Sequence, residues 1–186
     1  FVLYAKEGNL KHTRELLQTE FQRDTNRYDI LQDLGKVSYY LKDYEGAYEY
    51  YKRFNYQLET RKLDAFEHEN LVIGRVYELA GETERAKEFY DRYKHYVERD
   101  QTAYKNIGLA VYYCQMNDSA KALEHMRLFT QEDNIQYWLI LFMDKGPELT
   151  ETEASPEFKK LLQEVERKFW ANHERLKLTL EEQGLL

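Results

Sequence analysis

Apolar residues recur along much of the chain at the spacing that gives one face of an α-helix. The clearest stripe runs near the C-terminus, with spacings of three, four and seven residues, and consists of Phe158, Leu161, Leu162, Val165, Phe169, Leu176 and Leu180. Such spacing brings side chains to the same side of a helix. The first 146 residues contain no proline, a residue that interrupts helices. The pattern therefore predicts a nearly all-α chain.

Small residues form a pattern that occurs three times. One series is Gly35, Gly74 and Ala110, and the other is Ala47, Ala86 and Ala122. In both series the second member follows the first by 39 positions and the third follows the second by 36, so the two marks move together. A short polar segment lies between them in each copy. Each copy predicts two helices joined by a turn, with small residues where the helices approach closely. A helix pair cannot bury its apolar face alone, so we expect the copies to stack.

These marks resemble the tetratricopeptide repeat (TPR) family, through Leu34-Gly35 and Ile73-Gly74, the polar turn, the central alanine and the aromatic residues after it. The chain departs from the family pattern at the opening tryptophan, at the second alanine and at the closing proline. Leu31, Asn70 and Asn106 stand in place of the tryptophan, and Phe54, Tyr93 and Phe129 stand in place of the second alanine. The first two copies are also about five residues farther apart than the usual period of about 34. The resemblance implies a TPR-like helical hairpin solenoid. The alternative is an irregular helical bundle with close crossings.

Under this interpretation, residues 1–131 are TPR-like repeats, with a partial copy at 1–25 and others at about 28–62, 67–100 and 103–131. Residues 132–186 form a C-terminal helical cap. We expect a buried helix over residues 135–143 and a polar loop over 144–155. Ser155 and Pro156 are typical of a helix start, so a long capping helix should follow, to about Gln183.

The distal part of this long helix has an alternative use. Its large side chains, Phe169, Trp170, Leu176 and Leu180, could pair with a second chain and form a homodimer. The segment of residues 155–162 also resembles the one that follows TPR arrays in bacterial multidomain signalling and regulatory proteins. The alternative function is therefore a structural or dimerisation module of such a protein. The chain begins with Phe1, in what should be a helix, so we expect a fragment of a longer protein.

Composition narrows the function classes. The chain carries 27 Lys and Arg against 34 Asp and Glu, a net charge of −7, which argues against a nucleic-acid partner. No window of about 18 apolar residues predicts a membrane span. A single cysteine, Cys114, allows neither an internal disulfide nor a thiolate zinc site, and it mildly favours a cytoplasmic location.

The residues with reactive side chains form no catalytic pattern. No two of the five histidines have the i, i+4 spacing of a helical metal pair, and phosphate-binding glycine motifs are missing. Cys114 is expected to be a buried packing thiol. In the tyrosine-rich run 39–51, we expect Tyr44, Tyr48 and Tyr51 to pack between helices. The sequence therefore predicts no enzyme activity, no metal and no cofactor.

The resemblance to TPR proteins supplies the candidate site. Such arrays bind an extended peptide or a partner helix in a concave groove lined by the first helix of each repeat. The corresponding positions here are Lys36, Tyr39, Tyr40, His68, Arg75, Glu78, Tyr104 and Gln115. We therefore expect a noncatalytic scaffold that binds a protein or peptide partner in this groove. Whether the C-terminal helix itself occupies the groove stays open.

Overall fold

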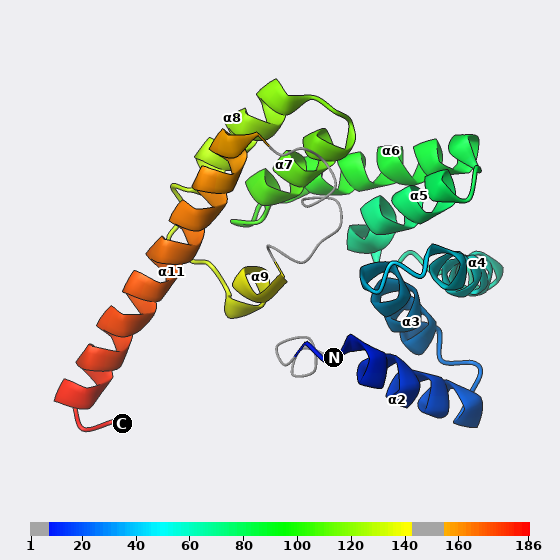
Figure 1. Cartoon of the computed structure of the whole chain (residues 1–186), viewed down its shortest axis with the longest axis horizontal. Helices are drawn as coiled ribbons and strands as arrows, with labels where there is room; N and C mark the ends of the chain where they lie inside the picture. Colours follow the sequence, from blue (N-terminus) through cyan, green and yellow to red (C-terminus); the bar gives the residue numbers. More distant parts are fainter. Residues whose placement is uncertain (1–7, 143–154) are drawn as a thin grey trace. The chain divides into compact units, whose positions relative to one another are not determined.

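The structure is a computed structural model that describes residues 8–142 and 155–186 (Figure 1). All the regular elements in these two ranges are helices, which confirms the all-α, TPR-like helical repeat fold. The chain divides into two compact units, Phe1–Arg99 and Asp100–Leu186, and each is described by itself. The third hairpin thus belongs to the same unit as the C-terminal segment, whereas the repeat pattern grouped it with the first two. No helix of the described ranges is long and apolar enough to cross a membrane.

The first unit contains two helical hairpins. Its elements are α2 (Leu10–Arg23), α3 (Tyr28–Tyr40), α4 (Tyr44–Arg61), the 3₁₀ turn η1 (Glu67–Glu69), α5 (Asn70–Leu79) and α6 (Thr83–Arg99). Helix α3 pairs with α4 and α5 pairs with α6, while α2 packs on α3 and α4 on α5. Each hairpin therefore buries a face of its neighbour, as stacking repeats must.

The second unit contains the third hairpin and the C-terminal helices. Its elements are α7 (Lys105–Gln115), α8 (Ser119–Phe129), α9 (Tyr137–Phe142) and α11 (Pro156–Glu182). Helix α7 pairs with α8, and α11 packs on α8. The long C-terminal helix therefore covers the outer helix of the last hairpin, as a capping helix should.

The three hairpins turn in the same way. The middle turn residue has a left-handed backbone in each, with φ of 60° at Lys42, 85° at Gly81 and 57° at Asn117. In each turn the next N–H donates, over 2.9 Å, to the carbonyl five positions earlier, which is the hydrogen bond of a Schellman helix end. The side chain of that next residue then caps the second helix in two hairpins, where Asp43 accepts from Gly46 N–H and Asp118 from Lys121 N–H.

Small residues allow the paired helices to meet, as the repeat pattern predicts. A Cβ atom at Gly35 would lie 2.8 Å from the ring of Tyr51, and one at Gly74 would lie 2.6 Å from the ring of Tyr90. These two glycine–tyrosine pairs occupy equivalent positions in the first two hairpins. The third hairpin has Ala110 in place of the glycine and Met126 in place of the tyrosine. The larger alanine is thus paired with a narrower and more flexible side chain.

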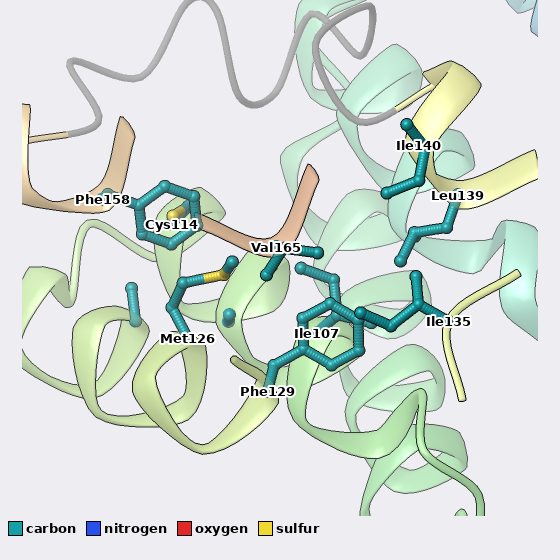
Figure 2. Packing of buried hydrophobic residues seen from close by; sticks show 11 residues of the cluster. Ile107, Cys114, Met126, Phe129, Ile135, Leu139, Ile140, Phe158 and Val165 are labelled. Carbon is teal, nitrogen blue, oxygen red and sulfur yellow. The ribbon is translucent and has the colours of Figure 1, made fainter. Parts of the chain in front are cut away.

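The core of the second unit joins α7 and α8 to the C-terminal segment (Figure 2). Phe158 and Val165 of α11 are buried among residues of both hairpin helices, and Ile135 and Leu139 join the same cluster. Polar contacts fix α11 further, because the Lys168 ammonium donates to two backbone carbonyls at the end of α8, over 3.2 and 3.1 Å.

One predicted element begins later than expected. The helix of the apolar run 135–143 begins at Tyr137 and is described to Phe142, and Tyr137 and Trp138 are exposed while Leu139 and Ile140 are buried. A six-residue helix can turn only one side to the core, so an all-apolar run cannot bury every side chain. Residues 1–7, position 143 and nearly all of the predicted polar loop lie outside the described residues.

Candidate functional site

Half-exposed side chains of α3 and of the α5 region form the surface that corresponds to the predicted groove in the first unit. Lys36 and Tyr40 lie four residues apart on α3, and Arg75 and Leu79 occupy the equivalent positions on α5. His68 lies 3.2 Å from Glu69, which also pairs with Lys36, and Glu78, at the position equivalent to Tyr39, joins these residues through its ion pair with Arg75. We call these six residues the α3–α5 face: Lys36, Tyr40, His68, Arg75, Glu78 and Leu79.

A buried acid ties the two halves of this face together. Glu69, only 2% exposed, forms an ion pair with Lys36, lies 3.2 Å from Nε2 of His68 and accepts a 3.4 Å hydrogen bond from the Tyr51 hydroxyl. Burial alone would raise the pKa of Glu69, but the charge of Lys36 and hydrogen bonds from His68 and Lys36 outweigh it and lower the pKa to about 2. Glu69 is therefore ionised and links α3 to the start of α5.

The second cation of the face is paired as well. Arg75 donates from Nη1 to Oε2 of Glu78 over 2.7 Å, and the Tyr90 hydroxyl donates to the same oxygen over 2.9 Å. Burial tends to lower the pKa of Arg75, but the hydrogen bond and charge of Glu78 raise it on balance. Lys36 and Arg75 are thus held in fixed positions by acids of their own chain, and neither offers an uncompensated charge to a partner.

Asp33 adds a negative group beside the Lys36–Glu69 pair. Burial raises the pKa of Asp33, the charge of Lys36 lowers it and that of Glu69 raises it again, and the net shift is upward. With Lys36 paired to Glu69 and Arg75 paired to Glu78, the α3–α5 face is a surface of balanced charge rather than a basic one.

Glu69 is the main residue that the sequence-based site lacks. The repeat alignment held a signal for it, because the equivalent position of the first copy is the buried Ile30. An acid at a position that is buried in a sister repeat needs a partner, and Lys36 supplies it.

Tyr39 is not on the surface, which corrects its predicted place as a groove contact. Its side chain is 1% exposed and its ring lies 5.8 Å from that of Tyr44, at the start of α4. One residue of helix turns the side chain by about 100°, so Tyr40 points outward where Tyr39 points toward the paired helix. Tyr51 is also fully buried, as the sequence predicts for a packing tyrosine.

The two predicted site residues of the second unit have different surroundings. Tyr104 packs against the core cluster of that unit, with its ring 5.4 Å from the ring of Trp138. Val111, equivalent to Lys36 and Arg75, packs on the same cluster. In this unit the apolar segment around α9 thus covers part of the inner face of α7. Gln115 lies half-buried at the end of α7.

The reactive side chains of the described ranges have structural surroundings. Cys114 is buried, as predicted, and burial raises its pKa to about 11, so the thiol stays protonated at neutral pH. His125 lies 3.1 Å from Oδ1 of Asn106 and stacks on Tyr113, and burial lowers its pKa. No group of three or more metal-ligating side chains gathers within residues 8–142 and 155–186.

The distal part of α11 has several exposed apolar side chains. Trp170 is 44% exposed and Leu176 is 58% exposed, whereas Leu180 is half-buried. Phe169 is partly committed to its own unit, because it packs on the core cluster and stacks with Tyr137 at 6.1 Å.

Comparison with known proteins adds little to this description. No family model matches the chain, and no curated protein matches it either. Among solved structures, the crystal structure of MamA is similar, with a TM-score of 0.44 and 17% sequence identity. The similarity covers 92% of this chain and 95% of MamA. Because this TM-score and this identity are low, the helical repeat fold is inferred from the hairpins of the chain itself.

Proposed function

We propose that this protein is a divergent TPR scaffold without catalytic activity, and that it binds an extended peptide or a partner helix on the α3–α5 face. The observation that supports the proposal is that apolar side chains of this face lie beside cations fixed in ion pairs. Tyr40 and Leu79 offer apolar surface, while Lys36 and Arg75 stand beside them in ion pairs that fix their positions.

Such a face suits protein binding for a physical reason. Ordering a long side chain on binding costs about 0.5–1.5 kcal/mol, and much of that cost is removed when the side chain is already fixed. Tyrosine and arginine are also the residues most often found at the energetic centres of interfaces. With its charges balanced, the face would draw affinity from the burial of Tyr40 and Leu79 and orientation from the paired charges.

The test is a selection of peptides from a random library on the immobilised wild-type protein. Peptides that bind should lose at least tenfold in affinity when Tyr40 and Leu79 are both replaced by alanine. Tyr56→Ala is the matched control, because Tyr56 is 69% exposed on α4 and is not one of the six residues of the face, and it should leave binding unchanged. Equal binding to the wild type and the double variant would refute the assignment of the face.

A second candidate function is self-association through α11. Phe169, His173, Leu176 and Leu180 are spaced by four, three and four residues, which is the spacing of a coiled-coil seam. In an antiparallel pair this seam is self-complementary, since Phe169 would face Leu180 of the other copy and His173 would face Leu176. The exposed Leu176 is the observation that favours it.

Light scattering over a range of concentrations tests this candidate. The wild type should form a dimer at high concentration, and Leu176→Lys should be monomeric, because a cation in the seam would be buried beside His173 of the other copy without an acid partner. Leu128→Lys, a change at an exposed leucine of α8, should still dimerise. A wild type that stays monomeric at every concentration would rule out self-association.

A further inference from the structure

The longer connection between the first two hairpins forms a hollow in the first unit. The hollow has a volume of about 300 Å³, and it lies between α4, the connection over residues 62–66, the start of α5, and α6. The connection begins and ends with left-handed residues, Lys62 and Phe66, with φ of 53° and 62°. Phe54, Ile73 and Phe89 give the hollow an apolar side. Its volume lies at the lower end of the range for small-molecule sites.

An amide with no hydrogen-bond partner among the described residues lines this hollow. Asn70, at the first position of α5, is 9% exposed, and no described residue forms a hydrogen bond with its side chain. The equivalent residue of the third hairpin, Asn106, pairs with His125 at 3.1 Å. The position equivalent to His125 in the second hairpin is Phe89, which also lines the hollow and cannot form that bond. The Asn70 amide therefore lines the hollow with its hydrogen-bonding groups available to a ligand there.

Two cations lie at the edge of the hollow without acid partners. Of the lining acids, Glu59 is held in an ion pair by Arg85, and Glu67 is held by Arg99 at 2.9 Å. By contrast, no ion pair joins Lys62 or Arg92 to any residue that the structure describes, and the remaining acid of the rim is Asp64. The guanidinium of Arg92 lies over the ring of Phe89, 5.5 Å from its centre. Cationic groups therefore adjoin the apolar side of the hollow.

We propose that this hollow is a binding site for a small carboxylate with an apolar body, such as an aryl-alkanoate. The apolar body would contact Phe54, Ile73 and Phe89. The carboxylate would accept a hydrogen bond from the Asn70 amide and pair with Lys62 or Arg92, which are free to reorient toward it. None of the residues that line the hollow belongs to the α3–α5 face, and binding in it requires no peptide partner.

The test uses 3-phenylpropionate as the probe and follows amide and side-chain NMR signals of the whole chain during titration. We expect saturable binding at about millimolar concentration, which is ordinary for a ligand of this size. The Asn70 side-chain NH₂ signals should shift most strongly. The neutral analogue 3-phenylpropanol, which keeps the apolar body, should bind at least tenfold more weakly.

Asn70→Leu tests the amide without creating a void, because it copies Leu31 of the first hairpin. It should abolish binding of the probe, and Arg92→Gln should weaken binding several-fold. Asn106→Leu is the control in the third hairpin, and it should leave binding unchanged. Lack of saturation by the wild type, or equal affinity in the Asn70→Leu variant, would overturn the proposal. Either result would leave peptide binding by the α3–α5 face untouched, because Asn70 is not part of that face.

Discussion

The packing of Gly74 against Tyr90 gives a direct test of how the paired helices fit. A methyl carbon at Gly74 would lie 2.6 Å from Cε1 of the tyrosine ring and 3.2 Å from the backbone oxygen of Ala86. Both contacts are too short, so the ring must move. Its hydroxyl donates a 2.9 Å hydrogen bond to Glu78, and this bond resists the movement. Gly74→Ala should therefore strain the second hairpin.

Two opposing contributions set the size of the effect. Alanine in a helix interior is favoured over glycine by about 1 kcal/mol, whereas overpacking a core costs about 1–3 kcal/mol. We expect Gly74→Ala to lower the free energy of unfolding by about 1 kcal/mol. Tyr90→Met copies Met126, whose hairpin accommodates Ala110. In the Tyr90→Met background, Gly74→Ala should be neutral or stabilising by up to about 1 kcal/mol.

Urea unfolding of the four proteins in this double-mutant cycle, followed by circular dichroism, measures the coupling. We expect the alanine to be tolerated better beside methionine than beside tyrosine by about 1–2 kcal/mol. The same change in unfolding free energy in both backgrounds would refute the idea that the small residue and its partner are matched.

Three further predictions concern Glu69, Cys114 and Ser155. The folded-state pKa of Glu69 lies below its unfolded value of 4.5, so its contribution to stability is full above about pH 4.5 and lost as the pH falls toward about 2. The unfolding free energies of wild type and Glu69→Gln, measured by denaturant titration, should differ by about 3 kcal/mol at pH 7 and converge over that window. Cys114 should react with a thiol reagent at pH 8 only as fast as the protein opens, so a rapid reaction would contradict its burial. Ser155→Ala removes the side chain that caps the N–H of Phe158, and it should lower the free energy of unfolding, measured in urea, by about 1 kcal/mol. An unchanged free energy of unfolding would contradict a stabilising role of that cap.

The repeat architecture was predictable because its signals are local. The co-moving small residues mark the close contacts of the hairpins, and the polar segments between them mark turns with one left-handed residue. The close approach of the paired helices could be predicted from Leu34-Gly35 and Ile73-Gly74 in the sequence alone. The long stripe of α11 was equally clear, since its period alone separates the buried Phe158 and Val165 from solvent-facing neighbours.

The site was less predictable, because it depends on pairing between helices. Sequence position placed Tyr39 and Tyr40 together, but the rotation of one residue buries the first and exposes the second. Lys36 and Arg75 carry charge in the sequence, yet in the structure each has an acid beside it. The unpaired amide of Asn70 depends on a phenylalanine 19 positions away in the paired helix, which no local pattern reveals.

Site-specific photo-crosslinking tests the central claim, that the α3–α5 face binds a protein partner. A photoreactive amino acid replaces Tyr40 in one variant, Leu79 in a second and Tyr56 of α4 in a control, and each is irradiated in cells that express the protein naturally. We predict that the Tyr40 and Leu79 variants crosslink to the same protein and that the Tyr56 variant does not. The claim would be contradicted if the Tyr56 variant crosslinked to that protein equally strongly. It would also be contradicted if neither position of the face gave a crosslink.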